Sequence, residues 1–407
     1  MSIASFFTAS HCLADQVVND VCRAMGAEKV GDGPIIERAA ALSGLGADKI
    51  ARAIFEKTSV FNKFSHEREK AVAYLKIALG ERLKSDPLVL DGFCGLLVGK
   101  TVSHVMKVAV TADVKFRVRQ YLAEKGGSEK DALRALHRGD ESRILWTEYL
   151  AKRDPWNSEL HDILLPMDKM GVDEAAAIVV ENLSKSVVMQ SAESLAAVDD
   201  FILAARVEAA LAEKGHTVGV SAKRATVYVT INKHVLLLSK LEEELRRIAS
   251  KVPGVATVET KVGSEFYQAD VYRPVNFELP SKVLLVDDER EFVQTLSDRL
   301  QMRDMGSTVV FDGEQALEFL RDEEPDVMVL DLKMPGIDGM EVLRRVKREH
   351  PAIEVIILTG HGSEKDRAAC MEAGAFAYLQ KPVDIEKLSD TMRRAYDKVR
   401  GRTREEA

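Results

Sequence analysis

Aromatic residues are scarce in this sequence of 407 residues, where they make up 6% of the chain. That scarcity argues against a β-sandwich and against a protein that binds RNA by stacking bases on aromatic side chains. Hydrophobic residues at 46% and charged residues at 30% are nevertheless enough to build packed cores, which excludes a disordered polymer. Since a domain usually takes about 100–200 residues, the length predicts two to four domains.

Cysteine is rare as well, and its positions form no C-x-x-C pair. The four cysteines are Cys12, Cys22, Cys94 and Cys370. This wide spacing predicts neither a disulfide framework nor a zinc ribbon, and it favours a reducing environment.

Long apolar runs and an excess of positive charge are also missing. The longest apolar stretches, such as 88–99, are too short and too interrupted to span a bilayer. The N-terminus lacks the basic region and the apolar run of a signal peptide. The formal net charge of -8 disfavours a globally basic nucleic-acid binder. We therefore expect a soluble, cytoplasmic, multidomain protein.

The clearest pattern lies in the last third of the chain, where short apolar runs alternate with amphipathic segments. The strand-like runs are 282–287, 307–311, 326–331, 353–358 and 376–379. The helical segments between and after them lie near 292–300, 313–322, 338–349, 364–373 and 384–400. Such alternation is typical of a parallel sheet that helices cover on both faces, so it predicts one doubly wound domain.

Polar side chains stand where four of these strands end. They are Asp287 and Asp288, Asp331, Thr359 and Lys381. Because parallel strands end at the same edge of a sheet, we expect these groups to converge there. A single aspartate at a strand end is usually a helix cap, but three carboxylates together repel each other and need a cation, for which Mg²⁺ is suited. With a lysine and a hydroxyl beside it, a carboxylate held by a metal can accept a phosphoryl group.

The same positions resemble the motifs of a response-regulator receiver domain. The matching stretches are VDD at 286–288, DLKMPGIDG at 331–339, TGHG at 359–362 and AYLQKP at 377–382. The resemblance covers residues 281–400 and implies a flavodoxin-like, doubly wound, five-stranded parallel sheet.

The resemblance also implies a role for each residue of the site. Asp331 would be the phosphoacceptor, and Mg²⁺ would be the cofactor. The metal site would consist of Asp287, Asp288, Asp331 and the backbone carbonyl of Lys333. Thr359 and Lys381 would hold the phosphoryl group, and Tyr378 matches the switch aromatic of the family. A sensor histidine kinase would be the phosphodonor. The output protein stays unidentified, a homodimer is left open, and no DNA-binding domain is seen after the receiver.

The first part of the chain, residues 1–185, is predicted to be α/β from strand-like runs at 2–7, 87–92 and 102–111. The stretches that resemble the cytidylate-kinase-like branch of the nucleoside monophosphate kinases are 87–97, 104–113, 116–122 and 128–156. The resemblance implies a P-loop-kinase-like fold. In such kinases an Arg-x-Asp-x-x-Arg pattern contacts nucleotide phosphates, which here would be Arg138, Asp140 and Arg143. A solvated helix face with i,i+3 ion pairs is the alternative interpretation.

The sequence departs from that family after the first strand. A phosphate-binding loop needs glycines so that backbone N–H groups can approach the phosphates, and usually a lysine. The segment 8–12 (TASHC) contains neither. We therefore expect a degenerate loop, no ATP-dependent kinase activity, and a fold used for sensing or contacts.

Residues 198–265 show an α-β-β-α-β order that resembles a BON domain. The resemblance implies binding of phospholipid or of a small ligand, and the stretch contains no catalytic constellation. A polar segment bracketed by prolines, 274–281, is predicted to link it to the last domain.

Taken together, these patterns predict a two-component response regulator whose receiver, phosphorylated on Asp331, controls the N-terminal domains or a partner. Two alternatives stay open. One is a nucleoside monophosphate kinase, of the CMP type, that the receiver regulates. The other is a scaffold that binds lipid or another ligand through the BON-like module.

Overall fold

The computed structural model describes residues 2–84, 87–232, 235, 237–263, 280, 282–301, 303, 305–360 and 363–405. The predicted linker 274–281, apart from Pro280, lies outside these residues, as do His361 and Gly362 of the TGHG stretch. The chain forms two compact units. The first comprises Met1–Lys57, Arg68–Glu213 and Thr217–Tyr272, and the second Thr58–Glu67, Lys214–His216 and Arg273–Ala407. Within the described residues, no helix has the length and apolarity that a bilayer crossing requires.

The first unit is built on a five-stranded, all-parallel sheet of order β2-β3-β1-β4-β5. Its strands are β1 (Ile3–Thr8), β2 (Glu28–Gly31), β3 (Leu88–Asp91), β4 (Val105–Thr111) and β5 (Ile163–Pro166). The apolar runs predicted as strands are β1, β3 and β4, the three central strands. The two edge strands were not predicted, because each has only four residues and a polar or exposed side.

Helices cover both faces of this sheet, because alternate residues of the buried strands point to opposite sides. The helices are α1 (Ala14–Met25), α2 (Asp32–Ser43), α3 (Ala47–Phe55), α5 (Glu67–Arg82), α6 (Val114–Lys125), α7 (Glu129–Ala151) and α8 (Val172–Leu183). Ile3 and Phe7 of β1 join the core that α2, α3 and α5 complete. Ala4 and Phe6 join the core that α1 and α8 complete. An α/β architecture was predicted for this part of the chain.

The small module that follows has the predicted order of elements. They are α9 (Ala192–Ala212), β6 (Gly219–Lys223), β7 (Thr226–Ile231), α10 (Leu238–Ala249) and β8 (Thr257–Val262). Strand β7 lies in the middle of the sheet, antiparallel to β6 and parallel to β8.

Helix α9 belongs to two hydrophobic cores at once. Its Val198 and Ile202 pack into the core of the first sheet, whereas Val207 and Leu211 pack against β7 and α10. The contact with α5 is close, since a Cβ atom added to Gly80 would lie 2.4 Å from Cγ1 of Ile202. The α/β part and the small module are therefore joined through a shared helix within one compact unit.

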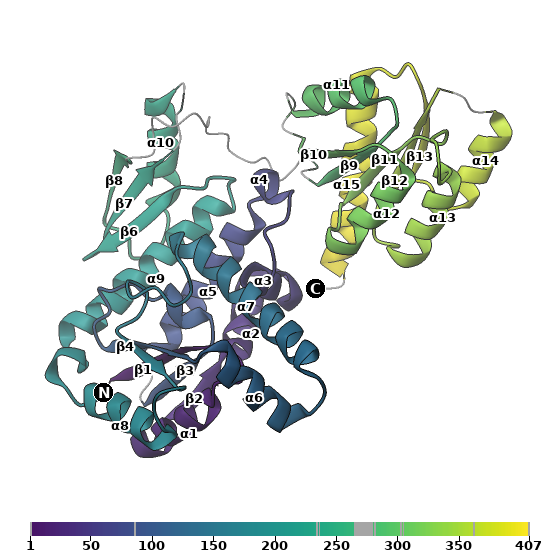
Figure 1. Ribbon diagram of the computed structural model, residues 1–407. Helices are drawn as coiled ribbons and strands as arrows, with labels where there is room; N and C mark the ends of the chain where they lie inside the picture. The colour runs from purple at the N-terminus through teal and green to yellow at the C-terminus, as the bar shows by residue number, and fades with distance from the viewer. Residues whose placement is uncertain are drawn as a thin grey trace. The chain divides into compact units, whose positions relative to one another are not determined.

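The second unit contains another five-stranded parallel sheet, of order β10-β9-β11-β12-β13 (Figure 1). Its strands are β9 (Val283–Val286), β10 (Ser307–Val310), β11 (Val327–Leu330), β12 (Glu354–Thr359) and β13 (Ala377–Gln380). Its helices are α11 (Arg290–Gln301), α12 (Gly313–Asp322), α13 (Gly339–Glu349), α14 (Glu364–Glu372) and α15 (Ile385–Glu405). The predicted flavodoxin-like topology is confirmed.

Both faces of this second sheet are covered as well. Helices α12 and α13 complete one core, with Ala316 and Val346 fully buried. Helices α11 and α15 complete the other, with Leu300 and Met392 fully buried. Side chains that follow the strands can meet solutes at the carboxyl ends of the strands, outside the covered faces. We call this end of the sheet its open edge.

A short segment from between α3 and α5 also belongs to the second unit. It includes α4 (Asn62–Ser65). Phe61 is fully buried, and its ring meets that of Phe319 on α12 edge to face. The carboxylate of Glu323 accepts hydrogen bonds from the Ser59 hydroxyl and from the Val60 amide. The ring contact with Phe319 and the hydrogen bonds to Glu323 together hold this segment against α12 and the residue after it.

One glycine makes the close packing at the open edge possible. A Cβ atom on Gly339, the first residue of α13, would lie 2.1 Å from the carbonyl oxygen of Asp331 and 2.7 Å from Cα of Leu332. Both are backbone atoms, so neither can rotate away. The start of α13 is thus held against the segment that follows β11.

We expect Gly339→Ala to lower the free energy of unfolding by about 1–3 kcal/mol, because an overpacked site must shift its backbone. Thermal unfolding of the full chain measures this. Gly401→Ala in α15 is the matched control: no heavy atom lies within 4 Å of its added Cβ, and helix propensity favours alanine there. If the Gly339 variant were as stable as the Gly401 variant, the inferred close approach would be wrong.

Candidate functional site

Three aspartates meet at the carboxyl edge of the second sheet. Asp287 and Asp288 directly follow β9, and Asp331 directly follows β11. Since β9 and β11 pair in parallel with Val286 opposite Leu330, the residues after them emerge side by side. One carboxylate oxygen from each aspartate lies within 4.8 Å of the others. Asp287 and Asp331 are buried, whereas Asp288 is exposed. The structure therefore brings together the three carboxylates singled out in the sequence.

Lys381, which follows β13, extends its ammonium group into this cluster. Its Nζ lies 2.6 Å from Oδ2 of Asp287, 2.9 Å from Oδ2 of Asp331 and 3.1 Å from Oε1 of Glu289. The side chain of Lys381 is only 10% exposed. Burial opposes its charge, but the carboxylates around it outweigh burial and raise its pKa above the ordinary value. Lys381 is thus a fixed positive charge in the site.

Burial and neighbouring charges also change the pKa of Asp287. Burial raises the pKa of Asp287, and the charge of Asp331 adds to the rise, although the Lys381 ammonium and the Glu289 amide oppose it. The Glu289 amide donates to Oδ1 of Asp287 at 3.0 Å. The Lys333 amide donates to Oδ1 of Asp331 at 3.2 Å. Backbone N–H groups therefore orient two of the carboxylates.

The other two predicted residues lie on the neighbouring strands. Thr359 is the last residue of β12 and is fully buried, and its carbonyl accepts a hydrogen bond from the Lys381 amide at 2.9 Å. Tyr378 lies on β13 opposite Ile357 of β12, and its ring packs against the core that α12 and α13 complete. The Tyr378 hydroxyl is buried and has no hydrogen-bond partner among the described residues. Burial raises its pKa.

The donor set decides which metal the site suits. Its three aspartates offer oxygen ligands only, and hard cations such as Mg²⁺ prefer carboxylate oxygens. No histidine or cysteine belongs to this cluster of described residues, so the donor set does not suit zinc. The residues present therefore fit Mg²⁺.

At the corresponding edge of the first sheet, two arginines contact the backbone. The carbonyl of Thr8, the last residue of β1, accepts a hydrogen bond from Nε of Arg143 at 2.5 Å. The Ser10 carbonyl accepts one from Nε of Arg117 at 2.8 Å. Arg117 also forms a bidentate ion pair with Asp140, at 2.7 and 3.0 Å. Two guanidinium groups thus hold the backbone of this loop through its carbonyls.

The three residues that the kinase-like resemblance pointed to, Arg138, Asp140 and Arg143, have different surroundings in the structure. Asp140 and Arg143 are engaged within the protein, one with Arg117 and the other with the loop after β1. The sequence did not single out Arg117 as part of this arrangement, because its partners lie far from it along the chain.

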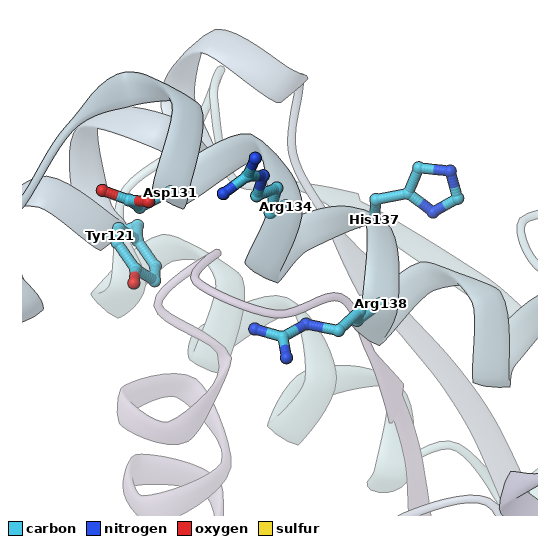
Figure 2. Close-up of a pocket in the computed structure, with 5 residues that line it drawn as sticks. All are labelled: Tyr121, Asp131, Arg134, His137 and Arg138. Atoms are coloured by element: carbon cyan, nitrogen blue, oxygen red, sulfur yellow. The ribbon is translucent and has the colours of Figure 1, made fainter. Parts of the chain in front are cut away.

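Arg138 lines an open pocket of about 700 Å³ on α6 and α7. The residues around it are Tyr121, Asp131, Arg134, His137 and Arg138. Figure 2 shows the guanidinium groups of Arg134 and Arg138 extending toward the side of Tyr121 and Asp131, whereas the His137 ring points away. Of the three residues named in the sequence, Arg138 is the one that lines this pocket.

Comparison with known families matches two separate parts of the chain. Residues 283–393 match the response regulator receiver domain. Residues 12–169 match the cytidylate kinase-like family. The second match begins at Cys12, after β1 and most of the loop that follows it.

The most similar curated proteins include two bacterial response regulators. The response regulator MprA of Mycolicibacterium vanbaalenii is 35% identical over 115 residues, which are 28% of this chain and 50% of that protein. The transcriptional regulatory protein CpxR of Escherichia coli is 42% identical over 108 residues, 26% of this chain and 46% of that protein. The chain thus spans about half the length of the curated relatives it matches. A solved receiver domain of Francisella response regulator 1452 is 30% identical, covers 29% of this chain and 98% of its own, and has a TM-score of 0.28.

The Arg117–Asp140 pair yields a test of the loop arrangement. We expect Asp140→Asn to lower the free energy of unfolding by about 1–3 kcal/mol, because it leaves a buried guanidinium without a counter-charge. Chemical denaturation of the full chain measures the change. Glu141→Gln, an exposed neighbour on α7, is the control and should change stability little. Equal effects of the two substitutions would contradict a structural role for the pair.

Proposed function

We propose that residues 283–393 are a phosphorylation-controlled receiver and that Asp331 accepts the phosphoryl group. The observation that carries the proposal is the cluster at the sheet edge. Three aspartates there offer carboxylate oxygens within 4.8 Å of one another, and two of them, Asp287 and Asp331, contact the ammonium of Lys381. The match to the receiver family over the same residues supports it.

The chemistry is a phosphoryl transfer from a phosphohistidine of a sensor histidine kinase. A carboxylate oxygen of Asp331 forms a bond to phosphorus while the phosphorus–nitrogen bond breaks, and the electron pair stays on the imidazole, which takes up a proton. Asp287, Asp288, Asp331 and the carbonyl of Lys333 would hold Mg²⁺. When bound, that cation supplies neutralisation of the charge on the phosphoryl oxygens.

The chain's own residues then convert this local charge into a change of shape. Lys381 pairs with a phosphoryl oxygen, and the Thr359 hydroxyl donates to another. Tyr378, on β13 just before Lys381, changes its packing in response. The population of receiver conformations shifts, and the N-terminal part of the chain or an unidentified output protein senses the difference.

We expect Asp331→Asn to abolish phosphorylation, because an amide has no nucleophilic carboxylate oxygen. Incubation of the full chain with labelled acetyl phosphate or with a labelled cognate kinase measures the label that is retained. Asp298→Asn, an exposed aspartate on α11, is the control and should be labelled like the wild type. Wild-type labelling of the Asp331 variant would disprove the assignment.

For the first part of the chain we propose a role without nucleotide kinase activity. The segment 8–12 contains no glycine or lysine, and its Thr8 and Ser10 carbonyls contact guanidinium groups. Asp140 and Arg143 are engaged in the same arrangement, so we assign the predicted phosphate contact to Arg138 alone. This part would then serve sensing or contacts with other molecules.

Incubation of the full chain with γ-labelled ATP and CMP or dCMP tests this interpretation. We expect no labelled nucleoside diphosphate, because segment 8–12 has no glycine that would let backbone N–H groups approach a phosphate. Nucleotide turnover that is lost in both Arg138→Ala and Arg143→Ala would instead contradict a role without kinase activity.

For residues 198–265, the order of elements supports the BON-like interpretation. A pocket of about 550 Å³ lies against α9 and β6, and Thr101 of the first sheet's part of the chain also lines it. Its lining combines apolar residues such as Phe201 and Val220 with the charged Glu193, Asp200, Lys223 and Arg224. A lipid or a small ligand stays the predicted partner of this module.

The cytoplasmic location and a homodimer likewise stay predictions.

A further inference from the structure

The ammonium of Lys381 contacts oxygens that a metal ion in this site would also bind. This ammonium contacts Oδ2 of Asp287 and Oδ2 of Asp331, which are two of the three predicted carboxylate ligands. A divalent cation and this ammonium therefore compete for the same oxygens. Since the side chain of Lys381 is only 10% exposed, an ammonium displaced from these oxygens needs other partners nearby.

Two such partners stand at the start of α11. Oε1 of Glu289 lies 3.1 Å from Nζ of Lys381, and the centroid of the Phe292 ring lies 4.4 Å from the same atom. Glu289 is 65% exposed and does not belong to the carboxylate cluster that could hold a metal. A carboxylate and the face of an aromatic ring both stabilise an ammonium. Both would stay available to Lys381 when a cation binds the aspartates.

We propose that Glu289 and Phe292 form a holding site for Lys381. When a divalent cation takes Asp287 and Asp331, Lys381 keeps its contacts with Glu289 and Phe292 and stays within reach of the incoming phosphoryl group. Glu289 is a positioning residue in this scheme, because it acts through Lys381 and touches neither metal nor phosphoryl group. The inference rests on the proposed receiver function and adds residues to its site.

The proposed holding site can be tested through the affinity of the chain for a metal ion, without any phosphorylation. Titration of the full chain with Mn²⁺, followed by the electron paramagnetic resonance signal of the unbound ion, gives the dissociation constant. We expect Glu289→Gln to weaken Mn²⁺ binding about two- to fivefold, since a half-exposed ion pair contributes modestly. Phe292→Leu keeps the apolar volume but removes the π face, and should weaken binding in the same direction by less. Glu291→Gln, which changes an exposed residue of α11, is the control for the change of net charge.

A double-mutant cycle with Lys381→Met shows how Glu289 acts. Lys381→Met alone should tighten Mn²⁺ binding, because it removes the internal competitor. In that background Glu289→Gln should change the affinity less than about 1.5-fold, since the coupled partner is gone.

Three results would overturn the proposal. The first is an equal effect of Glu289→Gln with and without Lys381, which would mean that Glu289 acts on the metal directly through its charge. The second is wild-type affinity of the Glu289 variant. The third, no Mn²⁺ binding by the wild-type chain, would overturn the receiver proposal as well, whereas the first two leave the receiver proposal intact.

Discussion

Parallel pairing between β9 and β11 is the constraint on which the candidate site depends. Their register sets Val286 opposite Leu330, so Asp287 and Asp331 leave the sheet as neighbours. Pairing of β12 with β13 sets Thr359 opposite Gln380 and carries Lys381 to the same edge. A shift of one residue in either pairing would turn these side chains to the other face of the sheet. The chemistry of the edge is therefore a consequence of backbone register.

The two parallel sheets of this protein use their carboxyl edges in opposite ways. In the second sheet, two buried carboxylates contact one lysine, and a small hard cation would compete with its ammonium for their oxygens. In the first, Arg117 and Arg143 bind the carbonyls of the loop after β1, so the protein satisfies those groups internally. A buried cluster with more carboxylates than ammonium groups is suited to bind a cation and react, whereas arginines that contact backbone carbonyls are suited to hold a shape. The same kind of fold thus supports two different roles.

How far the sequence could predict the structure depends on the range of the interactions involved. The second sheet was predictable because its three central strands, β9, β11 and β12, are fully buried and the helices between the strands have a clear apolar period. The edge strands β2 and β5 are short and partly polar, so they have no comparable pattern. Glu289 was missed because an exposed carboxylate next to two aspartates has no distinguishing spacing. The Arg117 contacts were missed because they join residues about 20 to 110 positions apart, which no local pattern records.

Helix α9 has a further consequence for how the first unit behaves as a whole. Because its apolar residues complete two cores, removal of the parts on either side would leave a stripe of leucine, isoleucine and valine in water. The energetic cost of losing one core is therefore felt by the other, and the two should melt in one cooperative transition. In evolutionary terms, neither part could be exchanged between proteins without the helix that they share.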